Sequence, residues 1–297
     1  MPSTRPPKEK RDPRLYQIAV LGTLLLYGVT VLDFEVRPLK AAVILAAALA
    51  SQWLMTRLFS LPRFDPRSAL ISGLSLCLLL RTNAVGLAVT AAVVTIAGKF
   101  LIRARGKHVF NPTNFGLVAM LLFADGVWVS AGQWGSAAIF GFFLAGLGGL
   151  VVNRARRGDV TWAFLVAYSA MLCGRAVWLG DPWAIPLHQL QNGAFLIFAF
   201  FMISDPKTTP DTRPGRILFA VLVAAVALFI QFGLFEPNSL LWALVGCAPL
   251  VPLIDRLLPG ERYRWPFPAR PAGAPGAHAP GYTMPSPPGL GHEPRPA

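Results

Sequence analysis

The apolar residues of this sequence come in long, uninterrupted runs rather than in stripes of helical period. A helix needs about 20 predominantly apolar residues to cross a bilayer, and runs such as residues 15–32 and 217–235 approach that length. Inside lipid, a helix satisfies its own backbone polar groups. Only 14% of the residues are charged, against about 25% in soluble domains. These features predict an all-α polytopic membrane protein.

About ten transmembrane segments are expected, separated by short polar or basic loops. They cover residues 15–32, 39–55, 69–80, 84–96, 114–129, 137–152, 160–179, 193–203, 217–235 and 239–254. Residues 1–14 are basic and Pro-rich, and residues 257–297 are rich in Pro and Gly without an apolar period. Such segments bury too little apolar surface to become ordered, so we expect two disordered tails around a membrane domain at residues 15–256.

The basic residues indicate how the chain lies in the membrane. Lys and Arg number 27 against 14 Asp and Glu, and they occupy short loops rather than one amphipathic face. This distribution argues against nucleic acid as a partner and is typical of the positive-inside rule. The first apolar run is too long for a signal peptide and is expected to stay as an anchor. We expect the lipid bilayer as partner, in a bacterial-type inner membrane, with both termini cytoplasmic.

Two of the expected segments are unusually short, and each is third in its half of the chain. Residues 69–80 stop at Arg81, and residues 193–203 break off into the polar sequence SDPKTTPD at residues 204–211. A ten-residue helix is about 15 Å long, roughly half the span of a bilayer. Short segments at matching positions predict a five-plus-five inverted repeat with a site between its halves. The alternative is that two helices are merely short or tilted.

The broken end of the second short segment indicates where such a site lies. Unpaired backbone groups at membrane depth are tolerated only inside protein or beside a water-filled cavity. Residues 203–210 carry a carboxylate, hydroxyl groups and two prolines directly after an apolar run. We therefore interpret this segment as the polar floor of a site.

Two motifs resemble those of the RnfD/NqrB family. Residues 107–116 (KHVFNPTNFG) resemble its K/R-H-x-F-N-P signature, and residues 201–210 (FMISDPKTTP) resemble its F-M-x-T/S-D-P segment. Family members are membrane subunits of ion-motive, flavin-containing electron-transport complexes, with a five-plus-five inverted repeat similar to that of urea transporters. The resemblance covers roughly residues 57–254. It is to the short RnfD-like branch, part of which carries an enediyne-biosynthesis (UnbU-like) label.

The resemblance also bears on the cofactor. Members with covalent FMN carry S-G-A-T after the fifth span, and the Thr hydroxyl there is esterified to the flavin phosphate. The corresponding turn in this chain, residues 130–136 (SAGQWGS), contains no Thr. The resemblance therefore implies noncovalent FMN or riboflavin and argues against covalent FMN at that turn.

The candidate cofactor-binding residues come from the two motifs. They are Asn111, Pro112, Thr113, Asn114, Asp205, Pro206, Thr208 and Thr209. The simpler interpretation of the first motif is a helix start with Asn111 as N-cap and Pro112 in the first turn. The same groups at a helix N-terminus also suit a flavin ring or phosphate. Asp205 fits a turn, or an ion pair with Lys207 or Arg213, although ionisable groups near membrane depth are functional candidates.

No metal site is predicted, and enzymatic activity is left open. Cys77, Cys173 and Cys247 each lie alone in apolar runs, while His108 and His188 are isolated loop residues. This spacing supports neither zinc nor iron–sulfur ligation. There is also no catalytic triad or phosphate-cradling Gly loop, so any redox chemistry belongs to a bound cofactor and not to an autonomous enzyme.

Side chains outside the motifs are assigned structural roles. Arg175, near the end of an apolar span, is expected to pair with Asp181. The glycines at residues 146–149 are expected to let helices pack closely. Tryptophans near the outer boundary are expected to form an interfacial belt.

Three functions remain open at this point. The first is a membrane component of an electron-transport system, working with other membrane redox subunits. The second is a channel or transporter for a small polar solute on a urea-transporter-like frame. Its pore would be lined by Ser72, Ser75, Thr82, Asn83 and Ser204. The third is an accessory membrane protein of an enediyne-type biosynthetic gene cluster.

Overall fold

The structure, a computed structural model, describes residues 12–31, 36–129, 147–149, 151–153, 155 and 157–263. Its helices are α1 (Pro13–Thr30), α2 (Pro38–Leu58), α3 (Pro66–Leu79), α4 (Val85–Leu101), α5 (Pro112–Phe123), α7 (Gly158–Leu179), α8 (Ala184–Leu190), α9 (Gly193–Ile197), α10 (Arg213–Gly233), α11 (Ser239–Cys247) and α12 (Val251–Leu257). A π-helix, η2 (Phe198–Met202), continues α9, and a 3-10 turn, η3 (Ala248–Leu250), joins α11 to α12.

Several helices begin at a proline because of the residue in front of it. Asp12, Asp65 and Asn111 are the N-caps of α1, α3 and α5, and a proline follows each of them. Proline suits the first helical position, where its missing N–H leaves no hydrogen bond unmade. The Asx side chain accepts one of the free N–H groups of the first turn. The predicted N-cap role of Asn111 is thus confirmed.

Four helical stretches of the described residues are long and apolar enough to cross a membrane. They are Pro38–Leu58, Gly158–Leu179, Arg213–Gly233 and Ser239–Leu257. Shorter apolar helices occupy Pro66–Leu79, Val85–Leu101, Pro112–Phe123 and Gly193–Met202, so both segments predicted to be short are short. The predicted class, a mostly helical multi-pass membrane protein, is confirmed. Most of the expected sixth span, residues 137–152, lies outside the described residues, and the count of ten stays a prediction.

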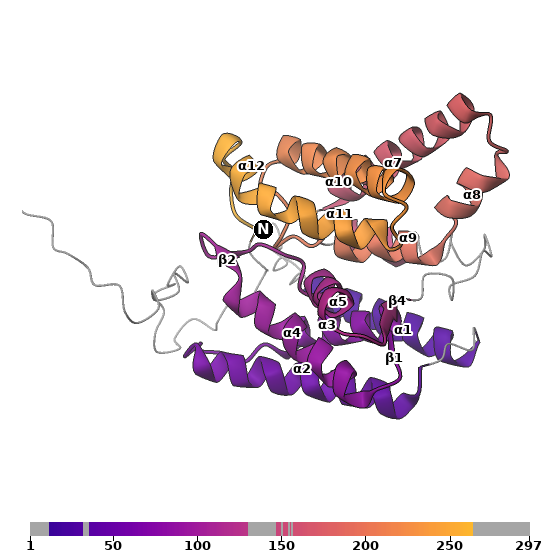
Figure 1. The fold of residues 1–297 in the computed structure, drawn as a ribbon. Helices are drawn as coiled ribbons and strands as arrows, with labels where there is room; N and C mark the ends of the chain where they lie inside the picture. Colours follow the sequence, from indigo (N-terminus) through magenta and orange to yellow (C-terminus); the bar gives the residue numbers. More distant parts are fainter. Residues whose placement is uncertain are drawn as a thin grey trace, which may run out of the picture. The chain divides into compact units, whose positions relative to one another are not determined.

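The helices gather into two groups that follow the order of the chain (Figure 1). In the first group α2 packs against α3 and α4, and α4 packs against α5. In the second, α10 packs against α7 and α11. Helix α5 also contacts α11 and so joins the groups. The site described below lies where the two groups meet.

Small residues allow the closest helix contacts. A Cβ atom placed on Gly116 of α5 would lie 1.8 Å from Oγ1 of Thr95 on α4. One on Gly148 would lie 2.5 Å from Cγ of Phe200, so the expected close packing of residues 146–149 is confirmed at Gly148. At both positions any larger side chain must displace its neighbour.

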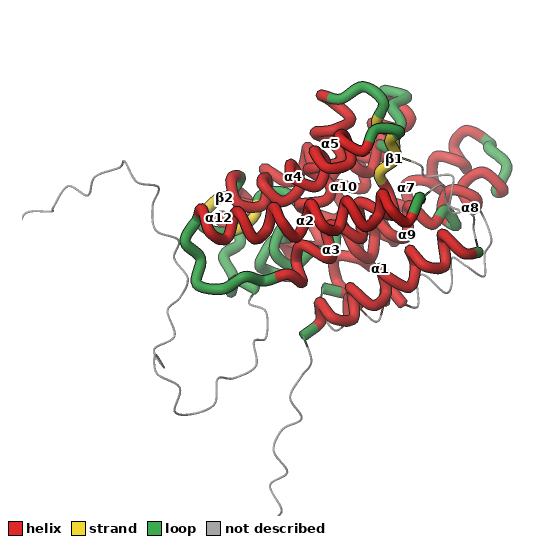
Figure 2. The backbone as a smooth tube through the Cα atoms, turned by 90° about the horizontal axis from the view of Figure 1, so that it is seen from below, coloured by secondary structure: helices red, strands yellow, loops and turns green. Residues whose placement is uncertain are grey.

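Two short antiparallel ribbons depart from the prediction of helix alone (Figure 2). Strand β1 (Leu80–Thr82) pairs with β4 (Val127–Val129), and β2 (Arg103–Ala104) pairs with β3 (Lys107–His108). The expected fifth span was to run to residue 129, but α5 ends at Phe123 and Gly126 has a φ of +79°. This left-handed glycine turns the chain back, and Val127–Val129 then pairs with the end of the α3 segment.

The expected tails lie mostly outside the described residues. Their boundaries differ slightly from expectation, because α1 begins at Pro13 and both Asp12 and Arg14 are buried. Arg14 bonds to Asp12 and to Asp65 at the start of α3. The predicted pair between Arg175 and Asp181 is confirmed, with 2.9 Å between Nη1 and Oδ2.

Candidate functional site

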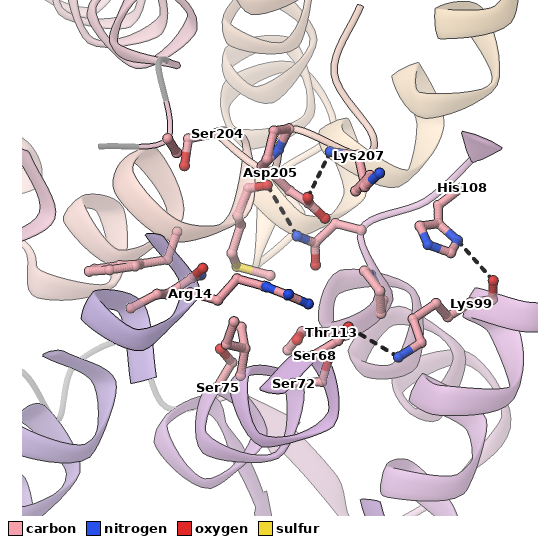
Figure 3. A pocket seen from close by; sticks show the side chains of 18 of the residues that line it. Arg14, Ser68, Ser72, Ser75, Lys99, His108, Thr113, Ser204, Asp205 and Lys207 are labelled. Atoms are coloured by element: carbon pink, nitrogen blue, oxygen red, sulfur yellow. Dashed lines mark hydrogen bonds between the residues drawn. The ribbon is translucent and has the colours of Figure 1, made fainter. Parts of the chain in front are cut away.

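A cavity of about 250 Å³ lies between the two helix groups (Figure 3). The first group contributes the starts of α1 and α3, the end of α4 and the segment from β3 into α5. The second contributes residues 151–155, the π-helix η2 and the turn that follows it. Both short helical segments, α3 and α9–η2, therefore reach the same cavity.

Four Asx-Pro steps meet at this cavity, and each makes the same local turn. They are Asp12-Pro13, Asp65-Pro66, Asn111-Pro112 and Asp205-Pro206. In each, the Asx side chain accepts a hydrogen bond from a backbone N–H two or three residues on, at 3.0–3.2 Å. The first three steps start helices, whereas Asp205-Pro206 is followed by a turn. Pro210 lies close behind and disfavours helical geometry at the residue before it.

Five of the eight predicted site residues line the cavity, and three do not. The lining residues are Asn111, Pro112, Thr113, Asp205 and Pro206. Asn114 instead donates from Nδ2 to the Leu241 carbonyl of α11 at 3.1 Å. Thr208 donates to the Asp205 carbonyl at 3.3 Å. Thr209 is 1% exposed, and its hydroxyl has no hydrogen-bond partner among the described residues.

Asn111 connects the two motifs directly. Its Oδ1 accepts from the Asn114 N–H at 3.0 Å, which caps α5. Its Nδ2 donates to the Met202 carbonyl at 3.2 Å, and Met202 ends the π-helix three residues before Asp205. One side chain thus fixes the start of α5 against the end of η2, across the boundary between the helix groups.

The π-helix gives the second group an irregular edge beside the cavity. Phe200, Phe201 and Met202 of η2 line it. Backbone carbonyls of this segment accept from side chains elsewhere, including the Thr161 hydroxyl to Ala199 at 3.0 Å. π-helical turns occur frequently at functional sites. Nothing in the apolar sequence FAFFM distinguishes this geometry from an ordinary helix.

The cavity contains carboxylates and cations that the motifs did not predict. Arg14, Asp65, Lys99 and Arg103 all line it. Lys99 is 6% exposed and donates from Nζ to Gln52 and, at 3.1 Å, to Ser68. A readable signal for the first two was the repeated Asp-Pro-Arg at residues 12–14 and 65–67, which matches Asp-Pro-Lys at 205–207.

Two titratable side chains outside the helices are shifted in opposite senses. Burial raises the pKa of Asp205 above its usual range, although the Lys207 N–H and nearby cations favour the carboxylate. Burial lowers the pKa of His108 to about 3, and the charges of Arg103 and Lys99 lower it further. His108 lies 2.8 Å from the Lys99 carbonyl through Nδ1, which must therefore carry the proton.

The His108 shift predicts a pH dependence of stability. An unfolded histidine takes up a proton near pH 6.5, whereas His108 in the folded chain does so only near 3. Its contribution is therefore complete above pH 6.5 and lost as the pH falls toward 3. We expect His108→Gln, whose amide can still donate to Lys99, to lose less stability than the wild type between pH 7 and pH 4.5.

Thermal unfolding of both proteins in the same detergent at the two pH values measures this difference. Asp205 titrates with the opposite sign, so the comparison is between variant and wild type rather than along one curve. Equal losses in the two proteins would show that His108 is not buried as a neutral side chain.

The cavity also bears on the solute-channel and metal hypotheses. Of the residues expected to line a channel, Ser72, Ser75 and Ser204 line the cavity, while Thr82 and Asn83 do not. No group of three or more His, Cys, Asp or Glu side chains able to hold a metal occurs in the described part of the chain.

Comparison with known proteins now identifies part of this chain. Residues 122–264 match the family described as NQR2, RnfD, RnfE. This region belongs to the NQR2/RnfD/RnfE family. The matched region includes the Asp205 segment and η2, whereas the Asn111 motif lies before it in the sequence.

Curated relatives of the family agree in name. The chain is 34% identical over 139 residues to a protein of Cronobacter sakazakii (strain ATCC BAA-894), the RnfD-type subunit of an ion-translocating oxidoreductase complex, and the match covers 42% of this chain and 39% of the relative. It is 35% identical over 135 residues to the protein of the same name from Escherichia coli O1:K1 / APEC, covering 44% and 36%. The aligned region therefore spans well under half the length of these relatives.

Proposed function

We propose that the chain is an RnfD-like membrane subunit of an ion-translocating oxidoreductase complex, and that it holds a flavin noncovalently in the cavity between its helix groups. The observation that carries this proposal is the hydrogen bond from Asn111 to the Met202 carbonyl, because it brings both family-like motifs to one cavity. The family match over residues 122–264 supports the class of protein. Other membrane redox subunits are then its expected partners.

The cavity lining fits the chemistry of a flavin. Phe100, Phe200 and Phe201 offer aromatic surface, while Asn111 and the buried Lys99 offer hydrogen-bond donors. The volume of about 250 Å³ lies just below the ~300–1,000 Å³ of typical small-molecule sites, so we expect rim side chains to move when the ring enters. A bound flavin supplies electron transfer, and the chain binds and orients it.

Neither FMN nor riboflavin is preferred by the two motifs alone. Asn111, Pro112, Thr113, Asp205 and Pro206 are the residues that we propose to contact the ring system. Thr208, Thr209 and Asn114 then act behind them by holding the turn and the α5–α11 contact.

Packing supports the five-plus-five inverted repeat that we propose for the membrane domain. The contacts of α2 with α3, of α2 with α4 and of α4 with α5 correspond to those of α7 with η2, of α7 with α10 and of α10 with α11. Each half thus places a short third segment beside the cavity. We propose ten spans in an inner membrane, with the tails at residues 1–14 and 257–297 both cytoplasmic, in accord with the basic loops.

The visible absorption spectrum of the purified full chain tests the proposal. We expect near-stoichiometric flavin that is released on denaturation, because the S-G-A-T attachment sequence is absent. A preparation that stays colourless after incubation with both FMN and riboflavin contradicts flavin binding. Flavin that stays attached after denaturation contradicts noncovalent binding.

A small-solute channel is the second candidate function, and one observation favours it. Ser72 and Ser75 of α3 and Ser204 after η2 place hydroxyl groups from both short segments on the same cavity. A colourless protein that conducts a polar solute in liposomes would establish this function. A flavin-containing protein that does not conduct would exclude it.

A further inference from the structure

The cavity has an excess of positive charge at the end of α4. Its charged lining consists of Arg14, Lys99, Arg103, Lys207, Asp65 and Asp205. The two carboxylates are already engaged. Asp65 is paired with Arg14 and caps α3, and Asp205 accepts the Lys207 N–H at 3.0 Å. Neither of them forms an ion pair with Lys99 or Arg103.

Lys99 and Arg103 have no acidic hydrogen-bond partner in the described part of the chain. Lys99 is 6% exposed and bonds only to the neutral side chains of Gln52 and Ser68. The Arg103 side chain makes no hydrogen bond or ion pair with a described residue, and its buried Nε is without a partner. A buried cation is normally paired, so two such cations beside one cavity point to a missing anion.

The two cations lie close to one another. His108 pairs with Arg103 across the β2–β3 ribbon, and its ring bonds to the Lys99 carbonyl at 2.8 Å. The pKa of Arg103 is lowered by burial alone, and the positive charges of Arg103 and Lys99 both act on His108. Pro112 and Thr113 at the N-terminus of α5 border the same cavity, where the helix dipole adds positive potential.

We propose that Lys99 and Arg103 form an oxyanion subsite that binds a phosphate monoester group. A phosphate monoester carries about −1.5 to −2 charges at pH 7, which balances two cations. The guanidinium fork of an arginine also matches phosphate geometry. The identity of its carrier rests on the function proposed above, under which the phosphate is that of FMN. The subsite therefore selects FMN over riboflavin, a choice that the two motifs left open.

Titration of the purified full chain with FMN and with riboflavin tests this selection. The protein is held in nanodiscs of zwitterionic lipid, and binding is followed by flavin fluorescence. We expect FMN to bind at least tenfold more tightly than riboflavin, since a hydrogen bond to a charged group contributes about that factor or more. In Arg103→Gln the preference should disappear while riboflavin affinity stays within about twofold, and Arg103→Lys should retain part of it.

Arg105→Gln is the matched control, because Arg105 is exposed in the turn of the same ribbon and does not line this cavity. It should keep the preference for FMN. Equal affinity of the wild type for FMN and riboflavin overturns the subsite and leaves flavin binding intact. An Arg103→Gln protein that still prefers FMN also overturns it.

Binding of neither flavin would refute the proposed function, and inorganic phosphate then tests the subsite alone. At matched ionic strength, phosphate should raise the melting temperature of the wild type and not that of Arg103→Gln. No rise in the wild type overturns the subsite. A rise in zwitterionic nanodiscs that vanishes in phosphatidylglycerol nanodiscs supports the subsite and assigns it to a lipid headgroup instead of FMN.

Discussion

Gly116→Ala is expected to destabilise the protein by about 3 kcal/mol or more, at the upper end of the range for overpacked cores. The new Cβ atom would lie 1.8 Å from Oγ1 of Thr95, 2.9 Å from its Cβ and 3.1 Å from its backbone Cα. A rotation of the Thr95 side chain relieves only the first contact. Helices α4 and α5 must therefore separate, and Asn111 at the start of α5 moves with them. Unfolding in denaturing detergent, together with flavin content, measures both effects.

A second substitution separates the clash from other effects of alanine. In Thr95→Gly combined with Gly116→Ala, the small residue changes sides, and most of the lost stability should return, less about 1 kcal/mol for glycine within a helix. Gly174→Ala in α7 is the control, since a Cβ there meets no atom within 4 Å. It should be neutral or slightly stabilising. A Gly116→Ala protein as stable as the wild type would show that α4 and α5 do not approach this closely.

Asn111→Ala is expected to cost about 2–4 kcal/mol and to remove the flavin. The change deletes an N-cap, which contributes about 1 kcal/mol, and leaves the buried Met202 carbonyl without its donor, which costs a further ~1–3 kcal/mol. The contact between α5 and η2 is then lost at the cavity. Thermal unfolding and the ratio of flavin to protein after purification report the two effects.

Asn111→Asp distinguishes capping from the contact between the helix groups. Aspartate accepts the Asn114 N–H as well as asparagine does but cannot donate to Met202. We expect it to retain the cap and lose most of the flavin. Asn192→Ala removes a comparable cap, which accepts the Ala194 N–H at 2.8 Å, at a site away from the cavity, and should leave flavin content unchanged. Full flavin content in Asn111→Asp would refute the role given to the Met202 contact.

Much of the helical framework could be predicted because lipid imposes a simple length rule. The short segments ending at Leu79 and Met202 were expected from the points at which their apolar runs stop. The end of α5 was not, because the apolar residues 127–129 continue the run and resemble a helix in composition. The turn at Gly126 decides the outcome, together with pairing to β1, a contact distant in sequence.

The candidate site was predictable only where a motif carried it. Asn111 and Asp205 stood out because polar residues interrupt apolar sequence. Arg14 belongs to a segment that resembled a disordered tail, and Lys99 and Arg103 belong to a loop whose charges had a sufficient explanation in topology. Their burial depends on how α1, α3 and α4 pack around the cavity, which the local sequence does not encode.

Photolabelling with an 8-azido flavin, followed by peptide mass spectrometry, tests most directly whether the flavin lies between the two helix groups. The full chain is labelled in nanodiscs with and without excess unmodified flavin. We predict competed labels on peptides that contain residues 99–115 and 200–207, because these segments line one cavity. Competed labels confined to other parts of the chain would contradict the site and the function proposed for it.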